Sequence, residues 1–248
     1  MDAARQVSFA LDAAIDRQAL RRAYVERRRA TIAPFLAADA AEALRAHLAE
    51  RTDWRLAIQA GGSKFVEIEV KDHEAMSPAQ REALQRAAAP TEPSGFRYLF
   101  DQIVAVGNTP ENREPDSPLG LFAGFLSSEV VLDLVRGITG ARDIAFAEAR
   151  ATRYRPGHFL TVHDDRHEET HRRVAYTFGL SPVWRPEWGG LLMFHDGGQD
   201  VERGLVPRMN ALNLFAVPRD HSVSLVAPFA PDPRYSVTGW MRALPGLG

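Results

Sequence analysis

Residues 154–165 read YRPGHFLTVHDD, and this stretch carries the strongest signal for both fold and site. Its second half is a short run that contains Phe, Leu and Val, and it predicts a strand over residues 159–165. Side chains two apart in a strand share a face, so we expect His163 and Asp165 to converge on one ion while Asp164 points away. Two ligands do not make a metal site, so a third must come from elsewhere.

His221 offers that third ligand, because it stands just before the strand-like run SVSLV at residues 222–226. Two histidines and one carboxylate on one face of an octahedron leave positions open, which is the arrangement expected of non-haem Fe(II) oxygenases. The chain has no cysteine. This excludes disulfides, a thiolate nucleophile, cysteine zinc sites and cysteine-held iron–sulfur clusters.

A second strand-like segment, RYSVTGW at residues 234–240, follows shortly after His221. Its alternation places Arg234, Ser236, Thr238 and Trp240 on one face. A guanidinium with a hydroxyl two residues further on can bind a carboxylate by charge-assisted hydrogen bonds. The geometry therefore favours a dicarboxylate ligand near the metal.

The segments beyond residue 140 predict a β-rich half. Short runs rich in β-branched and aromatic residues, separated by Gly, Pro and Asp, predict strands at 144–153, 159–165, 174–179, 190–195, 211–217, 222–227 and 235–241. The pair Gly189 and Gly190 permits a tight turn into one of them. This density of strands is typical of a sandwich, a jelly roll or a small barrel.

The first half is predicted to be helical support with one hairpin. A helical period runs through residues 14–49, with Pro34 starting a second helix, and alternation at 56–58 and 65–70 around a turn at 61–63 predicts an edge hairpin. Ser77, Pro78 and Gln80 predict a capped helix to about residue 89. A polar loop at 108–117 leads to an apolar helix at 119–138. These helices would cover one sheet face.

The motifs resemble the 2-oxoglutarate and Fe(II)-dependent oxygenases, specifically the prolyl 4-hydroxylase-like group, closest to its ribosomal prolyl hydroxylase branch. The resemblance covers about residues 140–241. The matching residues are Tyr154, Gly157, His163, Asp165, Trp184, Gly189, Gly190, Leu192, His221, Val223, Arg234, Ser236, Thr238 and Trp240.

The resemblance implies a double-stranded β-helix, or jelly roll, within an α+β fold whose core is mainly β. One oxygenase domain would span residues 1–248, with 1–139 as helical and edge-strand support and 140–241 as the barrel core. The N-terminal helices would pack on one sheet.

The resemblance also implies roles for the site residues. His163, Asp165 and His221 would hold Fe(II), and 2-oxoglutarate would chelate the metal while its far carboxylate meets Arg234 and Ser236. Thr238 and Tyr154 would line the co-substrate pocket, and Trp240 would meet the substrate. Reaction with O2 would release succinate and CO2 and hydroxylate a residue, by default prolyl, of a protein or peptide.

Composition limits the partners. The 30 Lys and Arg residues nearly balance the 32 Asp and Glu residues, so the net charge of −2 favours neither nucleic acid nor an anionic membrane as partner. No apolar core or cleavage site of a signal peptide follows the first residues, so we expect a cytoplasmic protein. The sequence leaves the oligomeric state and the substrate open.

Three alternatives remain beside a prolyl hydroxylase. The substrate could be a free amino acid or small metabolite, or the chain could be a non-catalytic jelly roll that binds a metal or ligand. The segment HEETH at residues 167–171 also matches a zinc peptidase motif, whose chemistry requires Glu168 and a helix with a buried face. Because this segment is charged throughout, we expect a solvated loop there. His158 and His195 are interpreted as structural.

Overall fold

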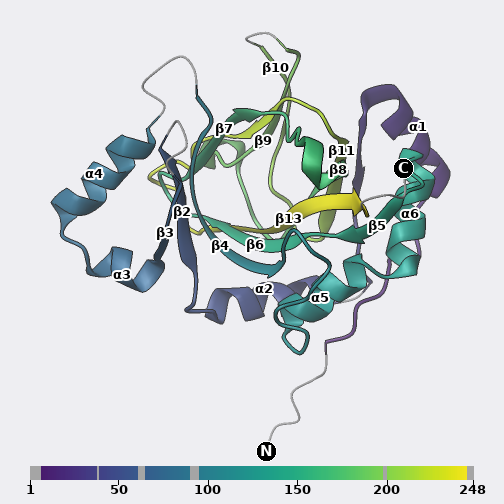
Figure 1. The fold of residues 1–248 in the computed structure, drawn as a ribbon, viewed down its shortest axis with the longest axis horizontal. Coiled ribbons are helices and arrows are strands. Elements are labelled where there is room, and N and C mark those ends of the chain that lie inside the picture. Colours follow the sequence, from purple (N-terminus) through teal and green to yellow (C-terminus); the bar gives the residue numbers. More distant parts are fainter. Residues whose placement is uncertain (1–6, 38, 61–64, 90–94, 198–199, 245–248) are drawn as a thin grey trace, which may run out of the picture.

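Antiparallel strands dominate the structure. The computed structural model describes residues 7–37, 39–60, 65–89, 95–197 and 200–244, and within them thirteen strands join one curled sheet (Figure 1). The strands are β1 (Arg29–Ile32), β2 (Arg55–Ala60), β3 (Phe65–Glu69), β4 (Arg97–Val106), β5 (Ile144–Ala147), β6 (Ala149–Tyr154), β7 (Phe159–His163), β8 (Arg172–Gly179), β9 (Leu192–His195), β10 (Val201–Leu205), β11 (Ala211–Ala216), β12 (His221–Val223) and β13 (Arg234–Ala243).

The strand order explains how the sheet closes on itself. It runs β1-β11-β8-β13-β6-β4-β7-β12-β9-β10. Strand β4 pairs with β6 through residues 101–106 and with β7 through Tyr98 and Leu99, so the sheet folds over at β4. The layer that contains β7 and β12 therefore faces the layer that contains β8 and β13. This arrangement confirms the predicted jelly roll with a mainly β core.

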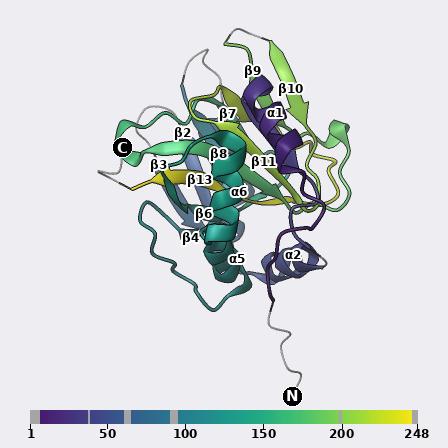
Figure 2. The ribbon, with the colours of Figure 1, turned by 90° about the vertical axis from the view of Figure 1, so that its right-hand side faces the viewer.

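Helices cover the outside of the sheet. They are α1 (Arg17–Arg27), α2 (Ala40–Glu50), α3 (Val70–Ala75), α4 (Pro78–Ala88), α5 (Pro118–Leu126) and α6 (Glu129–Thr139), with short 3-10 turns η1 (Glu168–Thr170) and η2 (Pro186–Trp188). In Figure 2, α6 and α5 stack one above the other in front of the sheet, beside α1. Helices α5 and α6 bury Phe122, Val135 and other apolar side chains, which explains their composition.

The capped helix at Ser77 has the predicted geometry. The Ser77 hydroxyl accepts a hydrogen bond from the Gln80 amide at 3.3 Å, and the Gln80 side chain accepts one from the Ser77 amide at 2.9 Å. Two of the free amides at the helix start are thereby satisfied. Helix α4 begins at Pro78, as expected.

The structure corrects the prediction of two helices within residues 14–49, the second starting at Pro34. Helix α1 ends at Arg27, and residues 29–32 form β1, which pairs with β11. Pro34 starts no helix, and α2 begins only at Ala40. The reason is tertiary, because pairing with the edge of β11 satisfies the backbone of a segment whose local pattern favours a helix.

Other boundaries also differ from the predictions. The apolar run at 119–138 is two helices, because the Ser128 hydroxyl donates to the Phe125 carbonyl at 2.6 Å and the chain turns before Glu129. The strand predicted at 144–153 is β5 and β6. Strands β1, β4 and β10 were not predicted, so the first half contributes to the sheet as well as covering it. The predicted turn at 61–63 lies outside the described residues.

Among the helices of the described segments, no single one is both long and apolar enough to cross a membrane. Helices α5 and α6 reach that length and apolar character only together, as a pair bent by 49°.

Strand β13 lies centrally between β6 and β8. The alternation along it separates two environments. Tyr235, Val237 and Met241 are buried in the main hydrophobic core. Arg234, Ser236, Thr238 and Trp240 face a cavity on the other side. One strand therefore supports the core and lines the site at once.

Candidate active site

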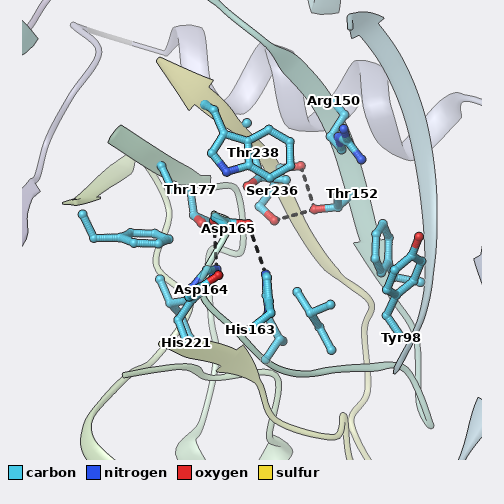
Figure 3. A pocket seen from close by; sticks show the side chains of 18 of the residues that line it. Tyr98, Arg150, Thr152, His163, Asp164, Asp165, Thr177, His221, Ser236 and Thr238 are labelled. Carbon is cyan, nitrogen blue, oxygen red and sulfur yellow. Dashed lines mark hydrogen bonds and ion pairs between the residues drawn. The ribbon is translucent and has the colours of Figure 1, made fainter. Parts of the chain in front are cut away.

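The two histidines of the site are direct neighbours across a strand pair. His163 ends β7 and His221 begins β12, and these two residues are opposite each other in the antiparallel register. Their ring centroids are 4.1 Å apart. Figure 3 shows both imidazoles pointing toward Asp165. The Nε2 atoms of His163 and His221 each lie 3.3 Å from an oxygen of the Asp165 carboxylate.

Asp165 reaches this position by a turn, which corrects the sequence argument. Strand β7 ends at His163, and Asp165 has a φ of 62°, in the left-handed region. The two side chains therefore do not share a strand face; the turn after β7 directs the carboxylate back toward the histidines. A non-glycine residue in this region costs on the order of 1 kcal/mol, and such strain clusters at functional sites.

Backbone carbonyls determine which nitrogen of each histidine carries the proton. The Nδ1 of His163 lies 3.0 Å from the Thr161 carbonyl, and the Nδ1 of His221 lies 2.8 Å from the Arg219 carbonyl. Because a carbonyl only accepts, both Nδ1 atoms must donate. Each Nε2 is then left with a free lone pair directed at the third ligand, which is the form a metal requires.

Electrostatics keep the ligands in their metal-binding protonation states. Burial alone would raise the pKa of Asp165, but the close approach of His163 and His221 to its carboxylate brings it down to about 2. Burial, together with the neighbouring His163, lowers the pKa of His221 to about 4. At neutral pH Asp165 is therefore a carboxylate and His221 a neutral imidazole.

These three side chains fit an octahedral metal ion. Metal bonds of about 2.1 Å at right angles place neighbouring ligand atoms about 3 Å apart, and the carboxylate–imidazole separations here are 3.3 Å. His163, Asp165 and His221 offer ligand atoms that all lie within 4.8 Å of one another. Within the described segments this is the one such group of three.

Arg234 lies at the start of β13 as a buried cation. Its exposed fraction is 4%, it makes no ion pair with any described residue, and its Nε has no hydrogen-bond partner there. Burial lowers the pKa of Arg234, and its guanidinium lies 5.1 Å from the centre of the Tyr154 ring. An unpaired buried charge is costly, so this residue fits an anionic ligand such as the far carboxylate of a dicarboxylic acid.

The remaining predicted residues line the same cavity of about 430 Å³. The Ser236 hydroxyl is bonded to that of Thr152 at 2.8 Å, and the Thr238 hydroxyl donates to the Tyr176 carbonyl at 2.8 Å. Tyr154 stacks on Phe100 at a ring distance of 5.2 Å. Trp240 also lines the cavity. The structure thus brings every predicted site residue to one cavity.

The histidines interpreted as structural lie elsewhere. His158 is buried and does not line the cavity, and His195 is bonded to the Ser222 hydroxyl at 2.8 Å on another surface. The peptidase motif has no helix, because η1 is a single 3-10 turn and His171 has a φ of 48°. It therefore lacks the helical turn that would bring His167 and His171 to one ion.

Sequence reasoning missed two groups of cavity residues. The first is an aromatic wall on β4 and just before it, made of Phe96, Tyr98 and Phe100, whose alternation in FRYLF is itself a strand signal. The second is polar and comprises Thr152, Thr177, Arg150 and Arg172. Figure 3 shows Tyr98 and Arg150 on the side of the pocket away from His221.

A jelly roll that brings two histidines, one carboxylate and a buried arginine to one cavity has the donor set expected of a non-haem Fe(II) oxygenase site. Residues 149–242 match the family model described as 2OG-Fe(II) oxygenase superfamily, and the match includes all three metal-ligand candidates. This superfamily uses Fe(II), 2-oxoglutarate and O2, so the expected cofactors are confirmed at the level of the family. A search of curated proteins finds no match.

Solved structures share the fold at low identity. A Pseudomonas putida prolyl-4-hydroxylase aligns with a TM-score of 0.57 and 18% identity, over 92% of this chain and 100% of the other. A prolyl hydroxylase from Trichoplax adhaerens, in complex with a hypoxia inducible factor peptide fragment, has a TM-score of 0.58 and 14% identity. The alignment covers 92% of this chain and 89% of the other. A 2OG-Fe(II) oxygenase family protein from Burkholderia pseudomallei has a TM-score of 0.59 and 13% identity, over 94% of this chain and 92% of the other.

Proposed function

We propose that this chain is a cytoplasmic 2-oxoglutarate- and Fe(II)-dependent dioxygenase that hydroxylates a prolyl residue of a protein or peptide, with release of succinate and CO2. The observation that carries the proposal is the convergence of three metal-ligand side chains and one unpaired buried arginine on the same cavity. Arg234 has no structural partner without a ligand, because its buried Nε lacks a hydrogen-bond partner among the described residues.

One group of residues binds the metal, and another binds and orients the co-substrate. His163, Asp165 and His221 hold the iron, and Arg234 with Ser236 binds the far carboxylate of 2-oxoglutarate. When bound, the metal and co-substrate supply the oxidative decarboxylation that delivers one oxygen atom to a substrate C–H bond. A 2.8 Å hydrogen bond between the Thr152 and Ser236 hydroxyls fixes the position of the Ser236 side chain in the cavity. The apolar walls exclude water.

Two observations support a prolyl substrate. Phe96, Tyr98 and Phe100 form a continuous aromatic wall, with ring distances of 5.3 and 5.1 Å, and such a surface suits the compact apolar ring of proline. The similar solved structures include prolyl hydroxylases, one of them bound to a peptide fragment. The motif resemblance to the ribosomal branch makes ribosomal proteins the first substrates to examine.

Incubation with a cell extract tests the proposal. The purified chain, with Fe(II), 2-oxoglutarate and air, is added to extract from a strain that lacks the gene, and peptides are searched for a gain of one oxygen atom. We expect succinate release and a modified proline at a defined site. The matched control is the Asp165→Ala variant, which should yield neither product.

Other outcomes would reassign the function. Succinate release with oxygen gained only by a free amino acid or metabolite would overturn the protein substrate. Fe(II) binding without succinate release in any extract would indicate a non-catalytic jelly roll that binds a metal or ligand.

A further inference from the structure

Two arginines lie against Trp240 inside the cavity. Neither belongs to the co-substrate anchor, which consists of Arg234 and Ser236. The Cζ of Arg172, on β8, is 3.5 Å from the centre of the indole ring, and the Cζ of Arg150, on β6, is 5.2 Å from it. Both residues line the cavity that contains the metal ligands. Contact with a flat ring restricts a guanidinium to one plane and leaves its N–H groups directed sideways.

The hydrogen-bonding capacity of this pair is largely unused. Arg172 makes no ion pair with any described residue, its buried Nε has no partner there, and its Nη1 donates only to the backbone carbonyl of Asp165 at 3.2 Å. Arg150 has a long bond of 3.3 Å to the Gln102 side chain and lies 3.9 Å from a Glu148 oxygen. That glutamate already pairs with Arg242 at 2.6 Å.

Arg150 and Arg172 are not required to neutralise the charges of the iron and 2-oxoglutarate. The charges of Fe(II) and Arg234 balance those of Asp165 and the two carboxylates of 2-oxoglutarate. Glu148 is balanced by Arg242, and the cavity-lining Asp164 pairs with Arg166 at 3.5 Å. Arg150 and Arg172 therefore remain as two positive charges in the loaded site.

The position of the pair also separates it from the far-carboxylate anchor. Trp240 is six residues from Arg234, which is about 20 Å along an extended strand. Arg172 lies beside the backbone of Asp165, at the metal end of the cavity, whereas Arg234 lies against Tyr154. The co-substrate carboxylate that meets Arg234 does not reach the pair on Trp240.

We propose that Arg172 and Arg150, held on the Trp240 ring, select a substrate that carries a carboxylate next to the hydroxylated residue, such as an acidic side chain flanking the target proline. This inference rests on the proposed function, since it names the chemistry of the substrate for the same site. Arg172, with its free Nε, makes the closer contact, and Arg150 adds charge from the side of Tyr98.

Binding under argon tests this without turnover. The protein is loaded with Fe(II) and 2-oxoglutarate, and its affinity is measured for blocked pentapeptides with a central proline flanked by Glu, by Gln or by Lys. We expect the Glu peptide to bind about tenfold more tightly than its Gln counterpart, because a charge-assisted hydrogen bond is formed in a partly buried site. The Lys peptide should bind most weakly.

The variants are chosen to isolate the two arginines. In Arg172→Gln the preference for Glu over Gln should fall to about threefold or less, and in Arg150→Gln/Arg172→Gln it should vanish. Arg172→Glu should prefer the Lys peptide, which identifies a charge effect even if one variant is less stable. The matched control is Arg173→Gln, because Arg173 pairs with Asp143 outside the cavity, so the wild-type preference should persist.

Several results would overturn the proposal. These are equal affinity for the Glu and Gln peptides, no detectable binding of the Glu peptide, an unchanged preference in the double variant, or loss of 2-oxoglutarate affinity in place of peptide affinity. The proposed function is judged separately, by the visible band that Fe(II) and 2-oxoglutarate give together and by succinate release in cell extract. Neither readout depends on the charge of the peptides.

Discussion

His163 and His221 are cross-strand partners in the β7–β12 pair, and each bonds through Nδ1 to the carbonyl of the residue two positions before it. The same local hydrogen bond thus orients two imidazoles that lie far apart in the sequence. Because the register of a strand pair is fixed by its hydrogen bonds, the distance between the two Nε2 atoms is built into the sheet. Asp165 then completes the site from a turn.

Loss of Asp165 should abolish iron binding. Anaerobic addition of Fe(II) and 2-oxoglutarate to the wild-type chain should give a visible charge-transfer band, and Asp165→Ala should lose it together with more than about 100-fold of activity. The matched control is Asp164→Asn, whose carboxylate accepts a hydrogen bond from the Arg166 amide at 2.9 Å. That variant should keep the band, and its loss in both variants would contradict the assignment.

Arg234 and Arg242 are both buried on β13, but removing their charges should change the stability of the ligand-free protein in opposite directions. Arg234 has no ion-pair partner among described residues, so Arg234→Met should stabilise the ligand-free protein by about 1–2 kcal/mol while lowering 2-oxoglutarate affinity by about 100-fold. Arg242→Met removes the close partner of the buried Glu148, leaving only the 3.9 Å contact with Arg150, and should cost about 3–5 kcal/mol. Thermal melts with and without 2-oxoglutarate check both. A ligand-induced rise in Tm retained by Arg234→Met would refute its anchoring role.

Stability should fall in mild acid partly because of His158. Burial lowers the pKa of His158 to about 4 from an ordinary value of 6.5, so the unfolded chain binds the proton first as the pH falls. The neutral form is favoured in the folded protein, and stability declines between about pH 6.5 and pH 4. From pH 7 to pH 5 this one group costs about 2 kcal/mol.

Urea unfolding at both pH values measures this effect. His158→Gln should lose about 2 kcal/mol less than the wild type between pH 7 and pH 5. Equal losses in the two proteins would show that His158 does not carry the pH dependence.

Gly239 should not tolerate a side chain, because a Cβ there would lie 2.1 Å from the Glu148 carbonyl oxygen. Gly239→Ala should therefore destabilise the protein by about 2–4 kcal/mol and disturb Thr238 and Trp240 on either side. Gly137, inside α6, meets nothing within 4 Å, so Gly137→Ala should stabilise by about 0.5–1 kcal/mol. Equal Tm shifts for the two variants would contradict this steric account.

Much of the site was readable from local pattern. The alternation along 234–240 correctly placed Arg234, Ser236, Thr238 and Trp240 on one face of β13, because the period of a strand is a property of the backbone itself. The capping signal at Ser77 was equally local. The convergence of His163 with Asp165 was predicted for the wrong reason, since a left-handed residue and not a shared strand face brings the carboxylate in.

The sequence by itself determined the kinds of ligand, the absence of thiolate chemistry and the face of β13 on which the anchor lies. Only the tertiary structure decided that β4 enters the barrel with an aromatic wall, that residues 29–32 join a sheet edge, and that Arg150 and Arg172 meet at Trp240. Donor chemistry and side-chain period are carried by each short segment, whereas the pairing of distant strands depends on burying apolar faces that no single segment contains.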